Sequence, residues 1–184
     1  KGYRPDLRGL EPGWQTKAYP CAFEWDKTRF PDPAGFTKEM LSSGLRRNLW
    51  TNPYVSADSP MFDQIDPFTA SHTVWCGTVP GLNHPEAKKR FAGQLEKDQV
   101  SIGVSGYKQD EVDGYDYYLW PDMATFPSGI SGIQMRQTYG VLSQKLIEEL
   151  YRKENTRTFG LVRASNAGAN NLPFVIYNDY YSHP

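Results

Sequence analysis

The stretch Tyr107-Lys108-Gln109-Asp110-Glu111-Val112-Asp113-Gly114 puts a group of carboxylates directly after an apolar, strand-like run. A second stretch, Val175-Ile176-Tyr177-Asn178-Asp179-Tyr180, repeats this arrangement near the end of the sequence. In parallel α/β sheets the carboxyl ends of the strands meet at one edge, and catalytic groups collect there. The two stretches therefore predict a parallel sheet with Asp110 and Asp179 at its catalytic edge.

Strand-like and helix-like segments alternate along the rest of the sequence. Helices are expected at residues 32–44, 83–99 and 131–153, because each begins at a capping residue and shows apolar side chains at helical spacing. Residues 51–82 have no sustained period, which predicts a long segment that is either functional or an excursion from the sheet, whereas residues 1–20 read as loop. Strands are expected at residues 21–25, 45–50, 158–162 and 174–177, and in a run that starts at residue 100 and leads to Asp110.

This alternation is typical of a parallel α/β architecture. A complete (β/α)8 TIM barrel needs roughly 250 residues, whereas this chain has 184 and about five strands. We therefore predict that residues 1–184 are a partial TIM-barrel catalytic domain. Parallel sheets are normally buried on both faces, so the rest of the same chain or another subunit is expected to complete the barrel.

Composition narrows the class of partner. Lysine and arginine together number 20 and the acidic residues 21, so the net charge is -1 and nucleic acid is not expected as a partner. No stretch approaches the length of a membrane span. The aromatic content of 14% weakly favours carbohydrate, because aromatic rings stack on the apolar faces of sugars. A secreted, periplasmic or lysosome-like compartment is slightly favoured, although the sequence leaves this open.

Neither a cofactor nor a metal ion is expected. The sequence contains no glycine-rich nucleotide-binding pattern, and its three histidines are scattered without metal-ligand spacing. Cys21 and Cys76 are compatible with one disulfide or with two buried thiols, and we favour the thiols. The paired carboxylates fit glycoside hydrolysis, in which retaining enzymes use two carboxyl groups about 5–5.5 Å apart.

The segment Arg163-Ala164-Ser165-Asn166-Ala167-Gly168, followed by Tyr177-Asn178-Asp179, resembles glycoside hydrolase family 31. In that family an Arg-Ser-x-x-x-Gly segment precedes the acid/base aspartate, and a Gly-aromatic-x-x-Asp strand end carries the nucleophile. The resemblance implies that Asp110 is the nucleophile and Asp179 the acid/base. It also implies a retaining, exo-acting α-glycosidase for terminal α-linked hexose of the galactose or glucose type. Further support comes from Trp25-Asp26-x-x-x-Phe30-Pro31-Asp32-Pro33 and from the loop that begins Trp120-Pro121-Asp122.

The chain also departs from the common family pattern. That pattern has tryptophan and then Asp-Met-Asn-Glu around the nucleophile, where this chain has Lys108 and then Asp110-Glu111-Val112-Asp113. It also has Trp-x-Gly-Asp where this chain has Tyr177-Asn178-Asp179. The glucose specificity of the commonest members is therefore not carried over, and the pattern is more similar to the α-galactosidase-like branch.

The expected substrate-binding residues are Arg163, Lys108, Trp120, Trp25 and Asp26. Arg163 offers a fork of donors for a substrate hydroxyl or for a carboxylate, or else forms an ion pair behind the sheet. Lys108 lies two residues before Asp110 on the same strand face, where it either supports that carboxylate and a sugar hydroxyl or forms a structural salt bridge. Each tryptophan either lines a sugar subsite or packs in the core.

Two functions remain open from the sequence. The first is the retaining α-glycosidase, acting on an oligosaccharide or glycoconjugate. The second is a sugar-binding or scaffolding fragment, which keeps the pocket but lacks the strands that hold the carboxylates at reacting distance. The two differ in turnover, because a binder would retain affinity for sugar and hydrolyse nothing.

Overall fold

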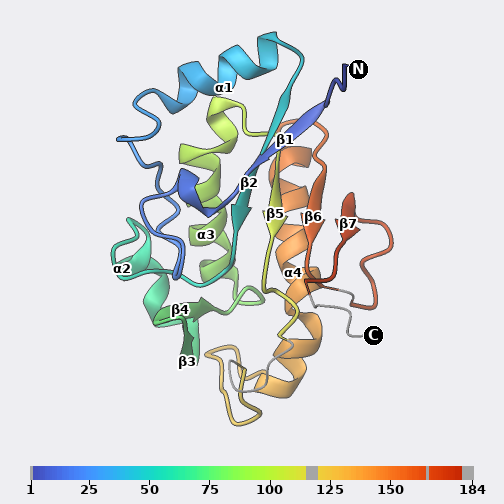
Figure 1. Cartoon of the computed structure of the whole chain (residues 1–184). Coiled ribbons are helices and arrows are strands. Elements are labelled where there is room, and N and C mark those ends of the chain that lie inside the picture. Colours follow the sequence, from blue (N-terminus) through green and yellow to red (C-terminus); the bar gives the residue numbers. More distant parts are fainter. Residues whose placement is uncertain (1, 115–119, 165, 180–184) are drawn as a thin grey trace, which may run out of the picture.

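Five parallel strands form the central sheet of the computed structural model, which describes residues 2–114, 120–164 and 166–179 (Figure 1). Their order across the sheet is β1-β2-β5-β6-β7, and every neighbouring pair runs parallel. The predicted partial barrel with five strands is therefore confirmed. The strands are β1 (Leu7–Leu10), β2 (Arg46–Thr51), β5 (Gly106–Gln109), β6 (Gly160–Val162) and β7 (Phe174–Ile176).

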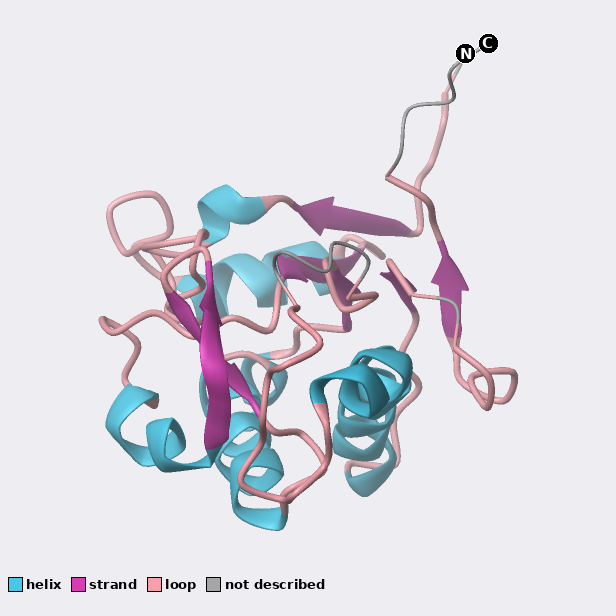
Figure 2. Cartoon of the chain, turned by 90° about the horizontal axis from the view of Figure 1, so that it is seen from below, coloured by secondary structure: helices cyan, strands magenta, loops and turns pink. Residues whose placement is uncertain are grey.

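Helices precede three of the five strands of the sheet along the chain and pack against one side of it (Figures 1 and 2). Helix α1 precedes β2, α3 precedes β5, and α4 precedes β6, as expected of β/α units. The α-helices are α1 (Pro33–Ser42), α2 (Phe62–Ile65), α3 (Pro85–Asp98) and α4 (Gly132–Lys153). Short 3-10 turns occupy η1 (Pro12–Trp14), η2 (Asp66–Phe68) and η3 (Val100–Ile102).

The helix starts follow from local capping chemistry. The Asp32 side chain accepts a hydrogen bond from the Gly35 amide at 2.9 Å, and Ser131 forms a capping box with Gln134. Both predicted starts are confirmed. Helix α3 is instead capped by His84, whose Nδ1 accepts from the Glu86 amide, while Asn83 bonds to a neighbouring loop.

Two strand predictions were wrong. Residues 21–25 form only isolated bridges, because Phe23 has a φ of 57° that interrupts extended backbone, and the first strand of the sheet is β1. Residues 100–102 form η3, and Gly103, with a φ of 96°, ends that turn before β5 begins. Strand β1 was missed because it is a short edge strand without β-branched residues.

The excursion predicted for residues 51–82 carries structure of its own. It contains α2, η2 and an antiparallel hairpin of β3 (Thr69–Val74) and β4 (Gly77–Pro80). Val55 pairs with Thr78 of the hairpin and also with Cys21, so the excursion is fastened to the N-terminal segment. Figure 1 shows the hairpin beyond the carboxyl ends of the strands, where barrel enzymes hold their sites.

Aromatic side chains fill the space between the sheet and the helices. The buried phenols are satisfied: Tyr107 donates to Gln99 at 2.9 Å, Tyr139 to the Pro80 carbonyl at 2.9 Å and Tyr151 to the Val104 carbonyl at 2.8 Å. Each of these hydrogen bonds joins a helix or a strand to another segment of the chain. Together they fix the sheet relative to its helices.

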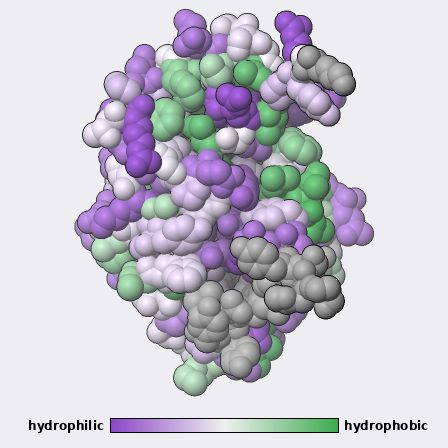
Figure 3. All heavy atoms as spheres, viewed as in Figure 1, coloured by the Kyte–Doolittle hydropathy of each residue, from purple (hydrophilic) through white to green (hydrophobic). Residues whose placement is uncertain are grey.

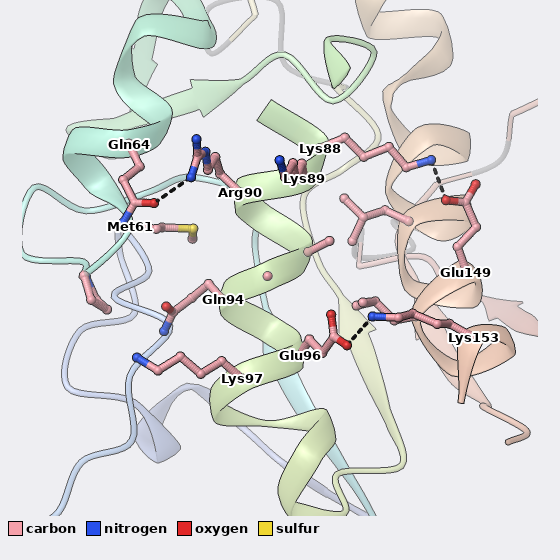
Figure 4. Close-up of a pocket in the computed structure, with 15 residues that line it drawn as sticks. Met61, Gln64, Lys88, Lys89, Arg90, Gln94, Glu96, Lys97, Glu149 and Lys153 are labelled. Carbon is pink, nitrogen blue, oxygen red and sulfur yellow. Dashed lines mark hydrogen bonds and ion pairs between the residues drawn. The ribbon is translucent and has the colours of Figure 1, made fainter. Parts of the chain in front are cut away.

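A surface groove of about 600 Å³ lies along the outward sides of α2, α3 and α4 (Figure 4). Lys88 pairs with Glu149 and Lys153 with Glu96, each at 2.5 Å, so two ion pairs span α3 and α4. Among the charged residues that line the groove, the basic side chains outnumber the acidic ones.

Close approach of the strands makes Gly160 a sensitive position. A Cβ at this position would clash with the carbonyl oxygen of Tyr107 in β5, and backbone cannot move aside as a side chain can. Gly160→Ala is expected to lower the free energy of unfolding by about 2 kcal/mol or more, measured by urea denaturation. Gly93→Ala is the matched control, since a Cβ at this position in α3 would meet no atom within 4 Å beyond the neighbouring backbone of its own helix. That change should stabilise the chain by about 0.5–1 kcal/mol. Equal effects of the two changes would contradict the packing described for β5 and β6.

Candidate active site

Asp110 is the point at which the ends of four strands converge. It follows β5 directly, and its backbone amide donates to the Thr51 carbonyl at the end of β2. Trp50 of β2 donates its indole N–H to Asp110 Oδ2 at 2.9 Å. Tyr177, the residue after β7, donates its hydroxyl to Oδ1 at 2.7 Å. The Asp110 residue is only 5% exposed, so these donors orient a nearly enclosed carboxylate.

Arg163 completes the convergence from β6. It follows Val162 directly, and its Nε lies 3.4 Å from Asp110 Oδ1 and 3.1 Å from Asp113 Oδ2. Its Nη1 lies 3.3 Å from Asp179 Oδ2. The guanidinium therefore sits among three carboxylates at the carboxyl edge, and the alternative of an ion pair behind the sheet is not what the structure shows.

The two predicted catalytic aspartates have different surroundings. The Asp110 side chain is 8% exposed, whereas the Asp179 side chain is 59% exposed and meets solvent. Both contact the same guanidinium, which brings them to one place as their positions after two strands predicted. One enclosed carboxylate and one open carboxylate are suited to different chemical tasks.

Tyr177 couples the last strand to Asp110. Burial raises the pKa of this phenol well above its ordinary value, and its hydrogen bond to the Asp110 carboxylate raises it further. The hydroxyl therefore stays protonated and acts as a permanent donor. Lys108 lies 5.3 Å from the centre of the Tyr177 ring.

Lys108 forms the structural salt bridge that was the alternative to a substrate contact. Its Nζ lies 3.1 Å from Glu11 Oε2, and it bonds to this exposed carboxylate. Its link to Asp110 is therefore indirect and passes through the ring of Tyr177.

The predicted substrate-binding residues Trp25, Asp26 and Trp120 make their hydrogen bonds to residues other than the carboxylates that surround Arg163. Trp25 is 3% exposed and donates to the Asp98 carbonyl at the end of α3. Trp120 is 1% exposed and donates to the Tyr54 hydroxyl at 3.0 Å. Asp26 accepts hydrogen bonds from the amide and hydroxyl of Thr28, and these lower its pKa. The two indoles pack as core residues, and Asp26 caps its own turn.

Trp75 is the open aromatic side chain near the carboxylates. It is 42% exposed, and its indole N–H donates to Glu111 Oε2 at 2.9 Å. Tyr19 is 51% exposed, with its ring centre 5.8 Å from that of Trp75 and 5.1 Å from that of Trp50. From the sequence, Trp120 was preferred to Trp75 as a tryptophan that lines the sugar subsite, and Tyr19 was missed. The exposure of Trp75 and Tyr19 depends on the position of the hairpin, which no local sequence pattern indicates.

Glu111 is a second enclosed carboxylate beside Asp110. It is 8% exposed, and its Oε2 also lies 3.4 Å from the donor nitrogen of Asn52. Burial raises the pKa of the Glu111 carboxyl, the Trp75 hydrogen bond opposes this, and the charge of Asp110 adds to the increase. The sequence identified Glu111 as a further carboxylate without a role.

The structure also bears on cysteines, metals and membranes. Cys21 and Cys76 are both free, the first buried and the second exposed, so the expected pair of buried thiols was half right. Within residues 2–114, 120–164 and 166–179 no group of three or more potential ligands is placed to hold a metal ion. In the same part of the chain, no helix has the length and apolar character needed to cross a bilayer.

Glu111 gives a pH-dependent test of this site. Because its pKa is raised on folding from 4.5, the folded chain holds this proton more tightly than the unfolded chain does. The Glu111 carboxyl group therefore stabilises the folded chain at low pH, and this stabilisation is lost as the pH rises through the pKa that the group has in the folded chain. Glu111→Gln should therefore stabilise the chain relative to wild type at about pH 8, and the difference should shrink towards about pH 4. Urea unfolding at the two pH values measures this, with Glu39→Gln on the exposed end of α1 as control. A pH-independent difference for Glu111→Gln would show that its carboxyl is not enclosed.

Comparison with known proteins covers almost the whole chain. Residues 6–183 match the family described as "Glycosyl hydrolases family 31 TIM-barrel domain". An α-xylosidase from Emericella nidulans is 25% identical over 176 residues, which cover 87% of this chain and 22% of that protein. The α-xylosidase XylQ of Lactiplantibacillus pentosus is 41% identical over 51 residues, or 28% of this chain and 7% of that protein.

Solved structures share the fold. A family 31 α-xylosidase from a soil metagenome, complexed with xylose, aligns with a TM-score of 0.77 at 16% identity over 92% of this chain and 26% of its own. A family 31 sulfoquinovosidase from E. rectale aligns with a TM-score of 0.76 at 20% identity, over 91% of this chain and 28% of its own. The chain spans about a quarter of these proteins. The match over residues 6–183 shows that the chain belongs to glycoside hydrolase family 31.

Proposed function

We propose that this chain supplies the catalytic pair of a retaining, exo-acting α-glycosidase, with Asp110 as nucleophile and Asp179 as acid/base. The observation that carries the proposal is the convergence of four strand ends on Asp110, with Asp179 held to the same guanidinium. The family whose TM-barrel domain matches supports the hydrolase class. Because the chain spans only 22% of the α-xylosidase from Emericella nidulans, the activity of the whole protein stays a proposal.

Asp110 is suited to attack on the anomeric carbon. Its carboxylate is oriented by the Trp50 indole, the Tyr177 hydroxyl and the Arg163 guanidinium, so little reorganisation is needed on substrate binding. Attack forms a bond from an Asp110 oxygen to the anomeric carbon, and the bond to the leaving oxygen breaks. The product of this step is a glycosyl-enzyme ester and a protonated leaving group.

Asp179 is suited to move protons to and from solvent. Its side chain is 59% exposed, which gives water access to the carboxyl group. In the first step it donates a proton to the leaving oxygen, and in the second it accepts one from the attacking water. The two displacements at the same carbon give net retention of configuration. Arg163 holds this carboxyl near Asp110 through both steps.

The sugar is proposed at a coarser level. The family resemblance favours a terminal α-linked hexose of the galactose or glucose type, in an oligosaccharide or glycoconjugate, and the departures around Asp110 and Asp179 favour the galactose type. The names of the relatives point to xylose as another possibility, since two of them are called α-xylosidases.

A second candidate function is a non-catalytic sugar-binding or scaffolding fragment. One observation favours it: within the described residues β7 is an edge strand, and Val175 and Ile176 are 49% and 53% exposed. Figure 3 shows hydrophobic surface on the side of the molecule where Figure 1 places β7. The wall of the barrel is thus incomplete within the described residues, and the rest of the chain or another subunit would have to close it.

Hydrolysis of aryl α- and β-glycosides by the longest form of the protein that carries this chain tests the proposal. Asp110→Asn is expected to lower kcat on every substrate by on the order of 10³-fold or more, because no nucleophile remains. Asp179→Asn should lower kcat least on substrates with strongly acidic leaving groups, because such groups depart without being protonated. Proton NMR of the first-formed sugar should show the α-anomer.

Asp58→Asn is the matched control, since Asp58 is an exposed aspartate paired with Lys17. It should keep the wild-type rate. An inverted product, or unchanged turnover in Asp110→Asn, would overturn the assigned roles. Sugar binding without any turnover would favour the non-catalytic candidate.

A further inference from the structure

Three non-glycine residues with left-handed backbone gather at one place beside Asp110. Trp75 and Cys76 have φ values of 52° and 63°, and Glu111 has a φ of 55°. Val74 pairs with Gly77 in the hairpin register, so Trp75 and Cys76 form the two-residue tip of the β3–β4 hairpin. Such tips normally carry asparagine and glycine, which tolerate this backbone. Strained backbone held in this way is typical of functional sites.

The strained tip directs Trp75 onto Glu111. The indole N–H donates to Glu111 Oε2 at 2.9 Å, and Asn52 also approaches this oxygen, at 3.4 Å. The backbone carbonyl of Glu111 accepts a hydrogen bond from Tyr54 at 2.8 Å. These bonds fix the Glu111 side chain, yet both donors to its carboxylate use one oxygen. Within the described residues, the other carboxylate oxygen, Oε1, accepts neither of these hydrogen bonds and is available to a donor on a ligand.

The hairpin itself is fixed to the body of the domain. Thr78 exchanges backbone hydrogen bonds of 2.9 and 3.0 Å with Val55, and a Cβ at Gly77 would clash with Pro20. Tyr19, next to Pro20, brings its ring to 5.8 Å from that of Trp75 in an edge-on arrangement. Two half-exposed rings and an enclosed carboxylate thus form one wall beside Asp110.

Charge on this edge is strongly one-sided. Asp110, Asp113 and Asp179 contact Arg163, and Glu111 adds a fourth carboxyl group. Lys108, the next cation along the edge, pairs with Glu11. In the described residues the carboxylates therefore outnumber the cations that face them, which repels an anionic ligand.

We propose that Glu111, held by Trp75 and flanked by Tyr19, is the specificity-determining carboxylate of the sugar pocket. Its Oε1 accepts a hydrogen bond from a hydroxyl of a neutral sugar, and its charge selects against sugars that carry a carboxylate or sulfonate. The aromatic rings of Trp75 and Tyr19 cover an apolar face of the same sugar. This inference rests on the proposed function, because it names the sugar class for that site.

Binding of matched sugars by isothermal titration calorimetry tests the proposal in the longest form of the protein. The probes are a neutral aryl α-hexoside and the uronide with the same ring stereochemistry, titrated into the Asp110→Asn background so that neither is consumed. The neutral sugar is expected to bind at least tenfold more tightly. Adding Glu111→Gln should lower the ratio of neutral-sugar affinity to uronide affinity by on the order of tenfold, because glutamine keeps the shape of the glutamate side chain and loses its charge.

Two further variants separate specificity from folding and from positioning. Trp75→Phe keeps a ring but loses the donor to Glu111, and it should narrow the ratio with a smaller loss of neutral-sugar affinity. Glu39→Gln makes the same chemical change at the exposed end of α1 and should leave the ratio unchanged. Circular dichroism and thermal melting check that each variant is folded.

The outcomes distinguish this inference from the proposed function. An unchanged ratio in Glu111→Gln, or an equal loss of affinity for both sugars, would overturn the specificity role even if the wild type hydrolyses glycosides. Preferential binding of the neutral sugar that depends on Glu111, without any turnover in the wild type, would support the specificity role and overturn the catalytic proposal. Failure to bind either sugar would overturn both.

Discussion

The enclosed carboxylate of Asp110 is the constraint on which the site depends. Removing a carboxylate from water is costly unless donors replace its hydration, and here the donors come from other strands. Trp50 approaches from β2, Tyr177 from beyond β7 and Arg163 from beyond β6. Satisfying one side chain therefore requires four strand ends to lie together, so the order of the sheet and the chemistry of its edge are linked.

The sequence was informative where structure is local. The caps at Asp32 and Ser131 predicted helix starts correctly, because a cap is formed by residues three positions apart. The meeting of Asp110 and Asp179 at one edge followed from their positions after strands, since parallel strands end at a common edge. The sequence left Arg163 open between this edge and an ion pair behind the sheet. The first strand was misplaced because β1 is short and belongs to the sheet only through its pairing with β2.

The aromatic wall could not be predicted from the sequence for a different reason. Trp75 and Glu111 are 36 residues apart and meet only because the hairpin is fastened through Val55 to the N-terminal segment. Trp75 is exposed whereas the other tryptophans are buried, and this difference depends on contacts between segments that are distant in the sequence. Composition indicated that aromatic residues matter but not which ones face solvent.

The open outer side of β7 has a consequence for handling the protein. Within the described residues β7 pairs with β6 on one side only, and its Val175 and Ile176 are exposed. Such an edge is a template for pairing with another strand. At high concentration this segment expressed by itself would recruit copies of its own edge, and insoluble aggregates would compete with folding. Soluble yield would therefore depend on covering β7, through added sequence that continues the sheet or through a charged substitution at Val175.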